Sequence, residues 1–319
     1  MANKRIRSRH APSGPTGHRD GVVGLVVAAG VLVAVALWSY WATIYDLLKE
    51  WQRNEDYSAG QLVPLVALIF IWIKRKQFRA CSLKPCWWAG VALLLLAQAG
   101  RFFGLLFLFE SAQRYSLVLT VAGLVLVVAG RQVFRQARWI LLFLFLMVPF
   151  PGQVHNRISG PLQGMATKGS VFLLEVFVPR VSQRGNVVML DKNTPMAVAE
   201  ACSGLRMLTA FIIVAAFIAF MVKRPRWQKA ALVLSSIPIA VVCNVVRIFF
   251  TALLMLFVSS EVGERFFHDF AGLVMMPVAV MLIFGELWVM DQLVLPDSHQ
   301  QSGAAKPRGP DIIHAKKSS

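Results

Sequence analysis

The chain has 319 residues, of which 57% are hydrophobic and only 15% are charged, and its mean hydropathy is +0.60. Soluble domains carry about 25% charged residues, so this composition excludes a soluble fold. A net charge of +17 would suggest nucleic-acid binding in a soluble chain. In a membrane protein the same excess marks the cytoplasmic side, where basic residues gather. We therefore expect a polytopic membrane protein whose environment is the lipid bilayer and which binds no nucleic acid.

Apolar runs that cross, or nearly cross, about 30 Å of hydrocarbon predict about eight transmembrane helices. The two shortest of these runs must borrow flanking residues to span the bilayer. In chain order the runs cover about residues 22–44, 60–73, 86–108, 115–130, 139–150, 205–222, 230–258 and 270–290.

Basic residues are concentrated in every second connection between these spans. Five connections and tails hold 21 Lys and Arg residues, whereas the alternate short connections 45–59, 101–114 and 259–269 hold five and are rich in acids. The basic set, which we expect to be cytoplasmic, covers residues 1–19, 74–85, 131–138, 223–229 and the tail after Gln292. Both termini are then cytoplasmic. The expected organisation is a basic tail (1–20), a membrane-embedded domain (21–292) and a disordered tail (293–319).

Residues 151–204 need a separate interpretation. The segment 161–179 is apolar and helical in period but carries Lys168 and Glu175, and counting it as a span would move the 223–229 loop outside. We expect an interfacial or re-entrant helix on the outer face. Residues 186–199 alternate apolar and polar around the turn DKNTP, which predicts a short β-hairpin. The expected fold class is thus all-α, a polytopic helix bundle with a small outer-face helix and hairpin.

Four cysteines stand in positions that do not allow pairing. Cys81 and Cys86 lie in or beside a cytoplasmic loop, Cys243 lies inside a span, and Cys202 lies at the outer end of the sixth span. In the stretch EACSGLR, Cys202 and Ser203 are expected to form the first turn of a helix, where a thiolate is favoured. A single membrane cysteine is more often a small packing residue, so Cys202 alone decides nothing.

Two arginines favour a reactive role for Cys202 over a packing role. Arg206 follows Cys202 by four residues, which places a cation on the same helix face as the thiol. Arg247 lies deep within an apolar run, where a charge costs at least about 2.5 to 3.5 kcal/mol, so it should face a wet cavity. Asn244, three residues earlier, can orient the guanidinium. The alternative for Arg247 is a structural tie to a carbonyl or carboxylate of another helix.

His268 stands beside Asp269 at the outer mouth of the last span. A lone histidine there is often only an interfacial residue. However, the topology puts Cys202, Arg247 and His268 on three consecutive spans, in the outer half or middle of the membrane. A nucleophile, an oxyanion donor and an acid/base group form a complete set for acyl transfer.

Three motifs carry a family resemblance: EACSGLR at 200–206, NVVRI at 244–248 and HDFAG at 268–272. In this order they resemble the exosortase and archaeosortase family of integral-membrane transpeptidases. DYSAGQLVPL at 56–65 is similar to the family's early motif, and the stretches PFPGQVHNRISGPLQGMAT and GNVVML resemble its outer loop. One departure is Ala59, where many members have histidine, so that position receives no role.

The resemblance implies roles for the site residues. Cys202 would be the nucleophile, Arg247 the oxyanion donor and His268 the acid/base group, and Arg206 matches a further arginine of the family. Asn244 and Glu200 complete the expected supporting residues. The resemblance also implies membrane protein substrates with a C-terminal sorting signal, made of a Pro-Glu-Pro-type motif, a hydrophobic helix and a basic end. The implied location is a bacterial inner membrane, with the active site facing outward.

No metal or cofactor is expected, because His and Cys are too sparse for a zinc site and no phosphate-binding glycine motif opens a helix. Two other functions stay open. A transporter would use Arg206 and Arg247 to bind an anionic substrate, but the chain shows no repeat of the CSGLR or NVVRI elements. The third possibility is an inactive scaffold, in which Cys202, Arg247 and His268 would have no function.

Overall fold

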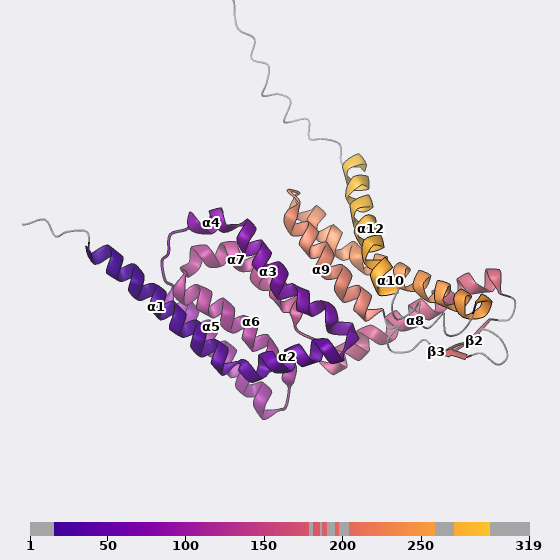
Figure 1. Cartoon of the computed structure of the whole chain (residues 1–319), viewed down its shortest axis with the longest axis horizontal. Helices are drawn as coiled ribbons and strands as arrows, with labels where there is room; N and C mark the ends of the chain where they lie inside the picture. The colour runs from indigo at the N-terminus through magenta and orange to yellow at the C-terminus, as the bar shows by residue number, and fades with distance from the viewer. Residues whose placement is uncertain are drawn as a thin grey trace, which may run out of the picture.

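The computed structural model describes residues 16–178, 181–185, 187–189, 195–197, 204–258 and 271–293. Helices dominate these residues, and three short strands form one small sheet (Figure 1). In chain order the elements are α1 (Thr16–Ser39), α2 (Trp41–Arg53), the 3-10 helix η1 (Glu55–Gln61), α3 (Leu62–Ile73), α4 (Arg75–Arg79), α5 (Trp87–Leu106), α6 (Glu110–Val128), α7 (Gly130–Leu144), the 3-10 turn η2 (Phe145–Met147), α8 (Gly152–Phe177), β1 (Ser182–Arg184), β2 (Val187–Met189), β3 (Pro195–Ala197), α9 (Leu205–Met221), α10 (Arg226–Phe257) and α12 (Ala271–Leu293).

The chain bends by 59° between α1 and α2, at Tyr40. The Tyr40 side chain is buried, and its hydroxyl lies 3.1 Å from the hydroxyl of Ser116 and 2.9 Å from that of Thr120, both on α6. Arg101 of α5 donates a hydrogen bond to the carbonyl of Ser39. Hydrogen bonds within a membrane protein tie helices together where no hydrophobic force acts between them. These bonds therefore hold the bend against α5 and α6.

An aromatic cluster joins α3, α7 and α9. Phe70 of α3 packs edge-on against Phe143 of α7 and stacks on Phe217 and Phe220 of α9. The main apolar core surrounds this cluster and includes Val63 of α3, Ile140 of α7 and Phe211 of α9. Aromatic pairs in such geometries add to the gain from burial alone. The core fixes α9 against the first half of the chain.

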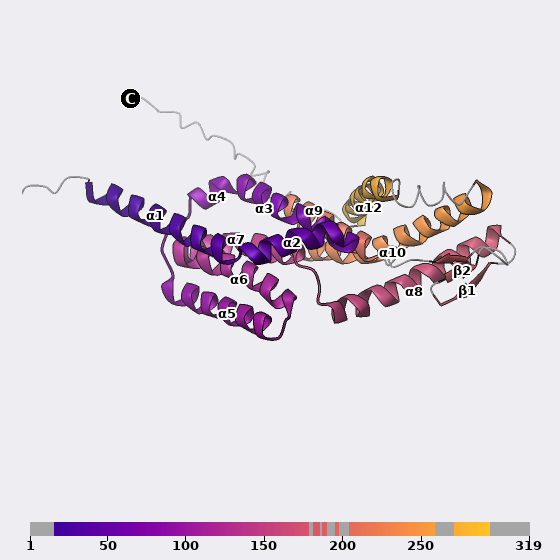
Figure 2. The ribbon, with the colours of Figure 1, turned by 60° about the horizontal axis from the view of Figure 1, so that its bottom comes forward.

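Helix α8 turns by 80° from the segment Gly130–Met147 and packs along α10 (Figure 2). Its residue Gly169 has no room for a side chain, since an added Cβ would lie 2.8 Å from Val245 of α10. The strands pair antiparallel in the order β1-β2-β3, and Val188 of β2 is buried against α8 and α10. The sheet therefore covers the end of the α8–α10 pair.

The all-α membrane fold class is confirmed, with differences in detail. Four described helices are long and apolar enough to span a membrane, or up to six segments if each bent pair counts as one span. The number of eight stays a prediction. The predicted hairpin is present as β2 and β3, and β1 adds a strand that the sequence did not indicate. The predicted outer helix at 161–179 is α8, which begins earlier, at Gly152.

Two regions predicted as connections between spans are helical. Region 45–59 contains the end of α2 and most of η1, since Thr43, Leu47 and Trp51 recur every four residues and form one buried stripe. Region 131–138 belongs to α7, which turns its basic residues outward and buries Ala137 and Ile140. A scan for continuous apolar runs misses such amphipathic helices. The proposed tails at 1–20 and 293–319 lie almost entirely outside the described residues.

Candidate active site

The start of α9 meets the middle of α10 at Gly204. Gly204 is the N-cap of α9 and has a left-handed backbone with φ of 74°. A Cβ at this position would lie 2.8 Å from Nδ2 of Asn244. Glycine is thus required for both its backbone angle and its lack of a side chain. The contact places Asn244 beside the chain segment that follows Cys202 by two residues.

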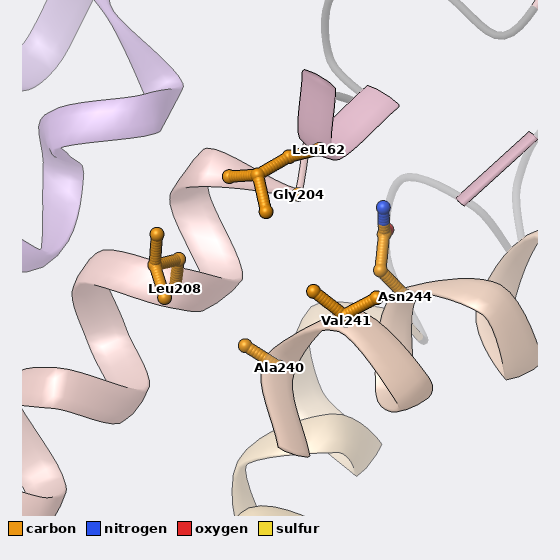
Figure 3. A pocket seen from close by; sticks show the side chains of 6 residues that line it. All are labelled: Leu162, Gly204, Leu208, Ala240, Val241 and Asn244. Carbon is orange, nitrogen blue, oxygen red and sulfur yellow. The ribbon is translucent and has the colours of Figure 1, made fainter. Parts of the chain in front are cut away.

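A small cavity lies at this contact between α8, α9 and α10 (Figure 3). Its volume of about 10 Å³ is close to the smallest space that holds one water molecule. It is lined by Leu162, Gly204, Leu208, Ala240, Val241 and Asn244. Apart from the Asn244 amide, the side chains that line it are apolar.

Arg247 and Asn244 occupy one face of α10, three residues apart. Asn244 is 1% exposed and Arg247 is 5% exposed. Burying a guanidinium is costly unless the protein compensates its charge and its donors, so α10 places this side chain inside the protein rather than in lipid. The wet cavity expected at Arg247 stays a prediction, because burial suits both that cavity and a structural tie between helices.

Arg206 lies in the first turn of α9 and forms an ion pair. Its Nη1 donates to Oε2 of Glu55 at 2.7 Å, and the two side chains are 42% and 55% exposed. In the same region the hydroxyl of Thr209 donates to the carbonyl oxygen of Asp56 at 3.0 Å. Helix α9 is thus fastened to η1 through two consecutive residues of η1. The Glu55 carboxylate offsets much of the charge that Arg206 brings.

The same 3-10 helix also holds α8. The Tyr57 hydroxyl lies 2.8 Å from Nδ1 of His155, and Nε2 of His155 lies 3.7 Å from Oδ2 of Asp56. Sequence reasoning gave none of Glu55, Tyr57 or His155 a role. For Tyr57 and His155 the available signal was the resemblance of their two segments, DYSAGQLVPL and the stretch around PGQVHN, to family motifs. Three consecutive residues of η1 therefore fix the starts of both α8 and α9.

The remaining predicted site residues, Glu200, Cys202 and His268, lie outside the described residues. Of the predicted set the structure places Arg206, Asn244 and Arg247, and it brings Asn244 against Gly204. The predicted helical turn at Cys202 and Ser203 also lies outside the described residues, and α9 begins at Leu205 after the left-handed Gly204. Within the described ranges, no group of three or more His, Cys, Asp or Glu residues could hold a metal ion.

Comparison with known proteins gives one family. Residues 51–285 match the family model described as transmembrane exosortase. This match covers most of the chain, from the end of α2 to α12, and includes every residue of the candidate site. No curated protein and no solved structure matches the chain.

Proposed function

The chain belongs to the transmembrane exosortase family, a family of membrane transpeptidases, and we propose that it catalyses acyl transfer with Cys202 as nucleophile. The observation that carries the proposal is the approach of Asn244 to Gly204. It sets the face of α10 that bears Arg247 beside Gly204, which follows Cys202 by two residues in the sequence. A cysteine, a buried arginine and a histidine supply the groups that acyl transfer needs.

In the proposed reaction the Cys202 thiolate attacks the carbonyl carbon of the scissile peptide bond. Arg247 donates hydrogen bonds to the oxyanion that develops on the carbonyl oxygen. The C–N bond then breaks, and His268 gives a proton to the leaving amine, which yields a thioester on Cys202. A second nucleophile attacks the thioester, returns its proton to His268 and releases the thiolate. An amine or hydroxyl of an anchor makes the reaction a transpeptidation, whereas water makes it a hydrolysis.

Arg247 is better suited than Arg206 to stabilise charge in this reaction. A buried guanidinium acts in a medium of low dielectric constant, where each hydrogen bond to an anion is stronger than in water. Arg206 is partly exposed and already paired with Glu55. We therefore assign the oxyanion role to Arg247 and a supporting role at the site rim to Arg206. Asn244 and Glu200 are kept as the other supporting residues.

The proposed substrates are membrane proteins with a C-terminal sorting signal of Pro-Glu-Pro type, a hydrophobic helix and a basic end. The active site would face outward from a bacterial inner membrane, with both chain termini in the cytoplasm. The distribution of Lys and Arg between alternate connections supports this orientation. An intramembrane arginine would also suit a transporter of anions, but the family match does not favour that alternative.

Substitution of Cys202 tests the nucleophile. Cys202→Ala and Cys202→Ser should both abolish substrate processing in cells, because a serine hydroxyl lacks a base strong enough to replace a thiolate. Cys81→Ala and Cys243→Ala are matched controls that should process normally. Processing by Cys202→Ala at the wild-type rate would rule out the mechanism.

Substitution of Arg247 separates chemistry from structure. Arg247→Lys keeps the charge but loses the planar fork, so turnover per folded molecule should fall by roughly 10² to 10³, the usual cost of one oxyanion donor. If Arg247 only tied helices together, Arg247→Ala would lower abundance and activity in parallel, and Arg247→Lys would restore both. The measurement is substrate cleavage normalised to folded enzyme. Near wild-type turnover in Arg247→Lys would refute the oxyanion role.

A further inference from the structure

An ion pair that is open to water lies where α9 begins. Arg206 donates from Nη1 to Oε2 of Glu55 at 2.7 Å, and the two side chains are 42% and 55% exposed. The contact joins one nitrogen of the guanidinium to one oxygen of the carboxylate. A guanidinium has five N–H donors in a planar fork and can hold two carboxylate oxygens at once. Arg206 can therefore bind a second carboxylate beside Glu55 or in its place.

The position of Arg206 on its helix favours an anion. Arg206 is the second residue of α9, and the first turn of α9 contains no acidic residue. The start of a helix carries partial positive charge, so a cation there is unfavourable unless an anion lies close by. Among the described residues, Glu55 alone forms an ion pair with Arg206. A carboxylate that reaches this turn is attracted by both the helix end and the guanidinium.

The backbone that carries Arg206 is held separately from the ion pair. Thr209, one turn later on α9, donates a hydrogen bond from its hydroxyl to the carbonyl oxygen of Asp56 at 3.0 Å. Exposed ion pairs change an equilibrium by less than about fivefold. A carboxylate that is already positioned by a bound substrate loses less freedom on pairing than the mobile side chain of Glu55. Glu55 can therefore give up Arg206 to a substrate without releasing α9 from η1.

Arg206 is also close to the proposed reaction along the chain. It follows Cys202 by four residues, and four residues span at most about 14 Å. The side chain of Arg206 can therefore reach a substrate residue that lies near the bond attacked by Cys202. An acidic side chain within a few residues of the scissile bond fits this position.

We propose that Arg206 determines substrate specificity by binding an acidic side chain of the substrate near the scissile bond, and that Glu55 pairs with Arg206 while no substrate is bound. This inference rests on the proposed function, in which the sorting motif carries a glutamate between two prolines. The carboxylate contact lowers the KM for acidic substrates, whereas Arg247 acts on the oxyanion and therefore on kcat. The two arginines thus divide substrate binding from chemistry.

The test uses the purified full chain in nanodiscs and a model substrate that ends in a Pro-Glu-Pro motif, a hydrophobic helix and a basic segment. It measures kcat and KM for this substrate and for a second one with glutamine in place of the motif glutamate. Wild type should show a KM about tenfold higher for the glutamine substrate. Arg206→Gln should show the higher KM for both substrates and should no longer distinguish them, with the effect on KM rather than kcat.

A charge reversal gives a second measure of the same contact. Arg206→Glu should cleave a substrate with lysine in place of the motif glutamate at a KM about fivefold below its KM for the glutamate substrate. A variant that had merely lost its fold would cleave neither substrate. Equal KM values for the two substrates in Arg206→Glu would overturn the proposal.

Glu55→Gln tests the competition. Removal of the competing carboxylate should lower the KM for the glutamate substrate by about twofold to fivefold. An ion pair that only supports the fold predicts the opposite, a lower melting temperature and a KM that does not fall. Arg53→Gln is the matched control, because it removes a charge from an exposed position two residues before Glu55 and should change the KM less than twofold.

Two further outcomes would overturn the site. Arg206→Gln that still distinguishes the glutamate substrate from the glutamine substrate would mean that another residue reads the acidic side chain. Equal effects of Arg53→Gln and Arg206→Gln would mean diffuse attraction between charges. Failure of the proposed function is a separate result: Cys202→Ala that cleaves at the wild-type rate would refute the nucleophile, whereas the comparison of the two substrates in Arg206→Gln would still decide the role of Arg206.

Discussion

Gly204→Ala is expected to destabilise the protein through two separate costs. The left-handed backbone, with φ of 74°, costs an alanine about 1 to 2 kcal/mol. The added Cβ also meets Nδ2 of Asn244 at 2.8 Å, and Asn244 is buried on a packed helix face. Overpacking of this kind costs about 1 to 3 kcal/mol. The two costs together give about 2 to 5 kcal/mol.

The assay is thermal unfolding of the purified protein in detergent or nanodiscs, compared with Gly164→Ala. Gly164 lies inside α8, with no atom within 4 Å of its added Cβ, so alanine there should be neutral or stabilise by up to about 1 kcal/mol. The same chemical change should therefore destabilise the protein at Gly204 and not at Gly164. In a double-mutant cycle, Asn244→Ala should recover part of the loss in Gly204→Ala. A Gly204→Ala protein that melts with wild type would refute the geometry at the start of α9.

Three other predictions concern the site rim and the orientation in the membrane. A double-mutant cycle of Glu55→Gln and Arg206→Gln should give a coupling of only about 0.2 to 1 kcal/mol, because the pair is exposed, and a larger value would mean that the pair is desolvated. Tyr57→Phe should cost about 1 kcal/mol in thermal unfolding through loss of the bond to His155, whereas no loss would show that the contact is dispensable. Labelling of single cysteines with an impermeant thiol reagent should reach region 152–193 from outside the cell and should not reach region 223–229. Labelling of region 223–229 from outside would mean that α8 crosses the membrane.

The helices that the sequence predicts best are the continuous apolar ones. The run predicted at 205–222 is α9 (Leu205–Met221), since glycine precedes it and a basic loop follows it. Helix α2 was missed because its buried residues are separated by polar ones and never form an apolar run. Its signal is a stripe with a spacing of four residues, which has to be searched for as such. The length of an apolar run therefore identifies membrane spans, and the spacing of apolar residues identifies the amphipathic helices that lie beside them.

The contacts of η1 could not be predicted from one sequence. Tyr57 and His155 are 98 positions apart, and Glu55 and Arg206 are 151 apart. No local rule of spacing or propensity links such residues, because the fold of the intervening helices decides whether they meet. The resemblance to family motifs marked both segments without saying that they touch. Those contacts became visible only with the packing of α8 and α9 around η1.

The sequence was informative about a charged side chain where its environment allowed few arrangements of that side chain. Arg247 lies within an apolar span, where exposure to lipid is costly, so the sequence predicted a wet cavity or a tie between helices, and the structure buries the side chain. Arg206 and Lys74 lie at helix ends, where water stabilises many arrangements equally well. Counting them as basic residues gave the expected orientation but not their partners, Glu55 and the ring of Phe220. The sequence therefore limits the position of a charged side chain inside a membrane-spanning segment. At a helix end in contact with water, a structure is needed to find the partner of that side chain.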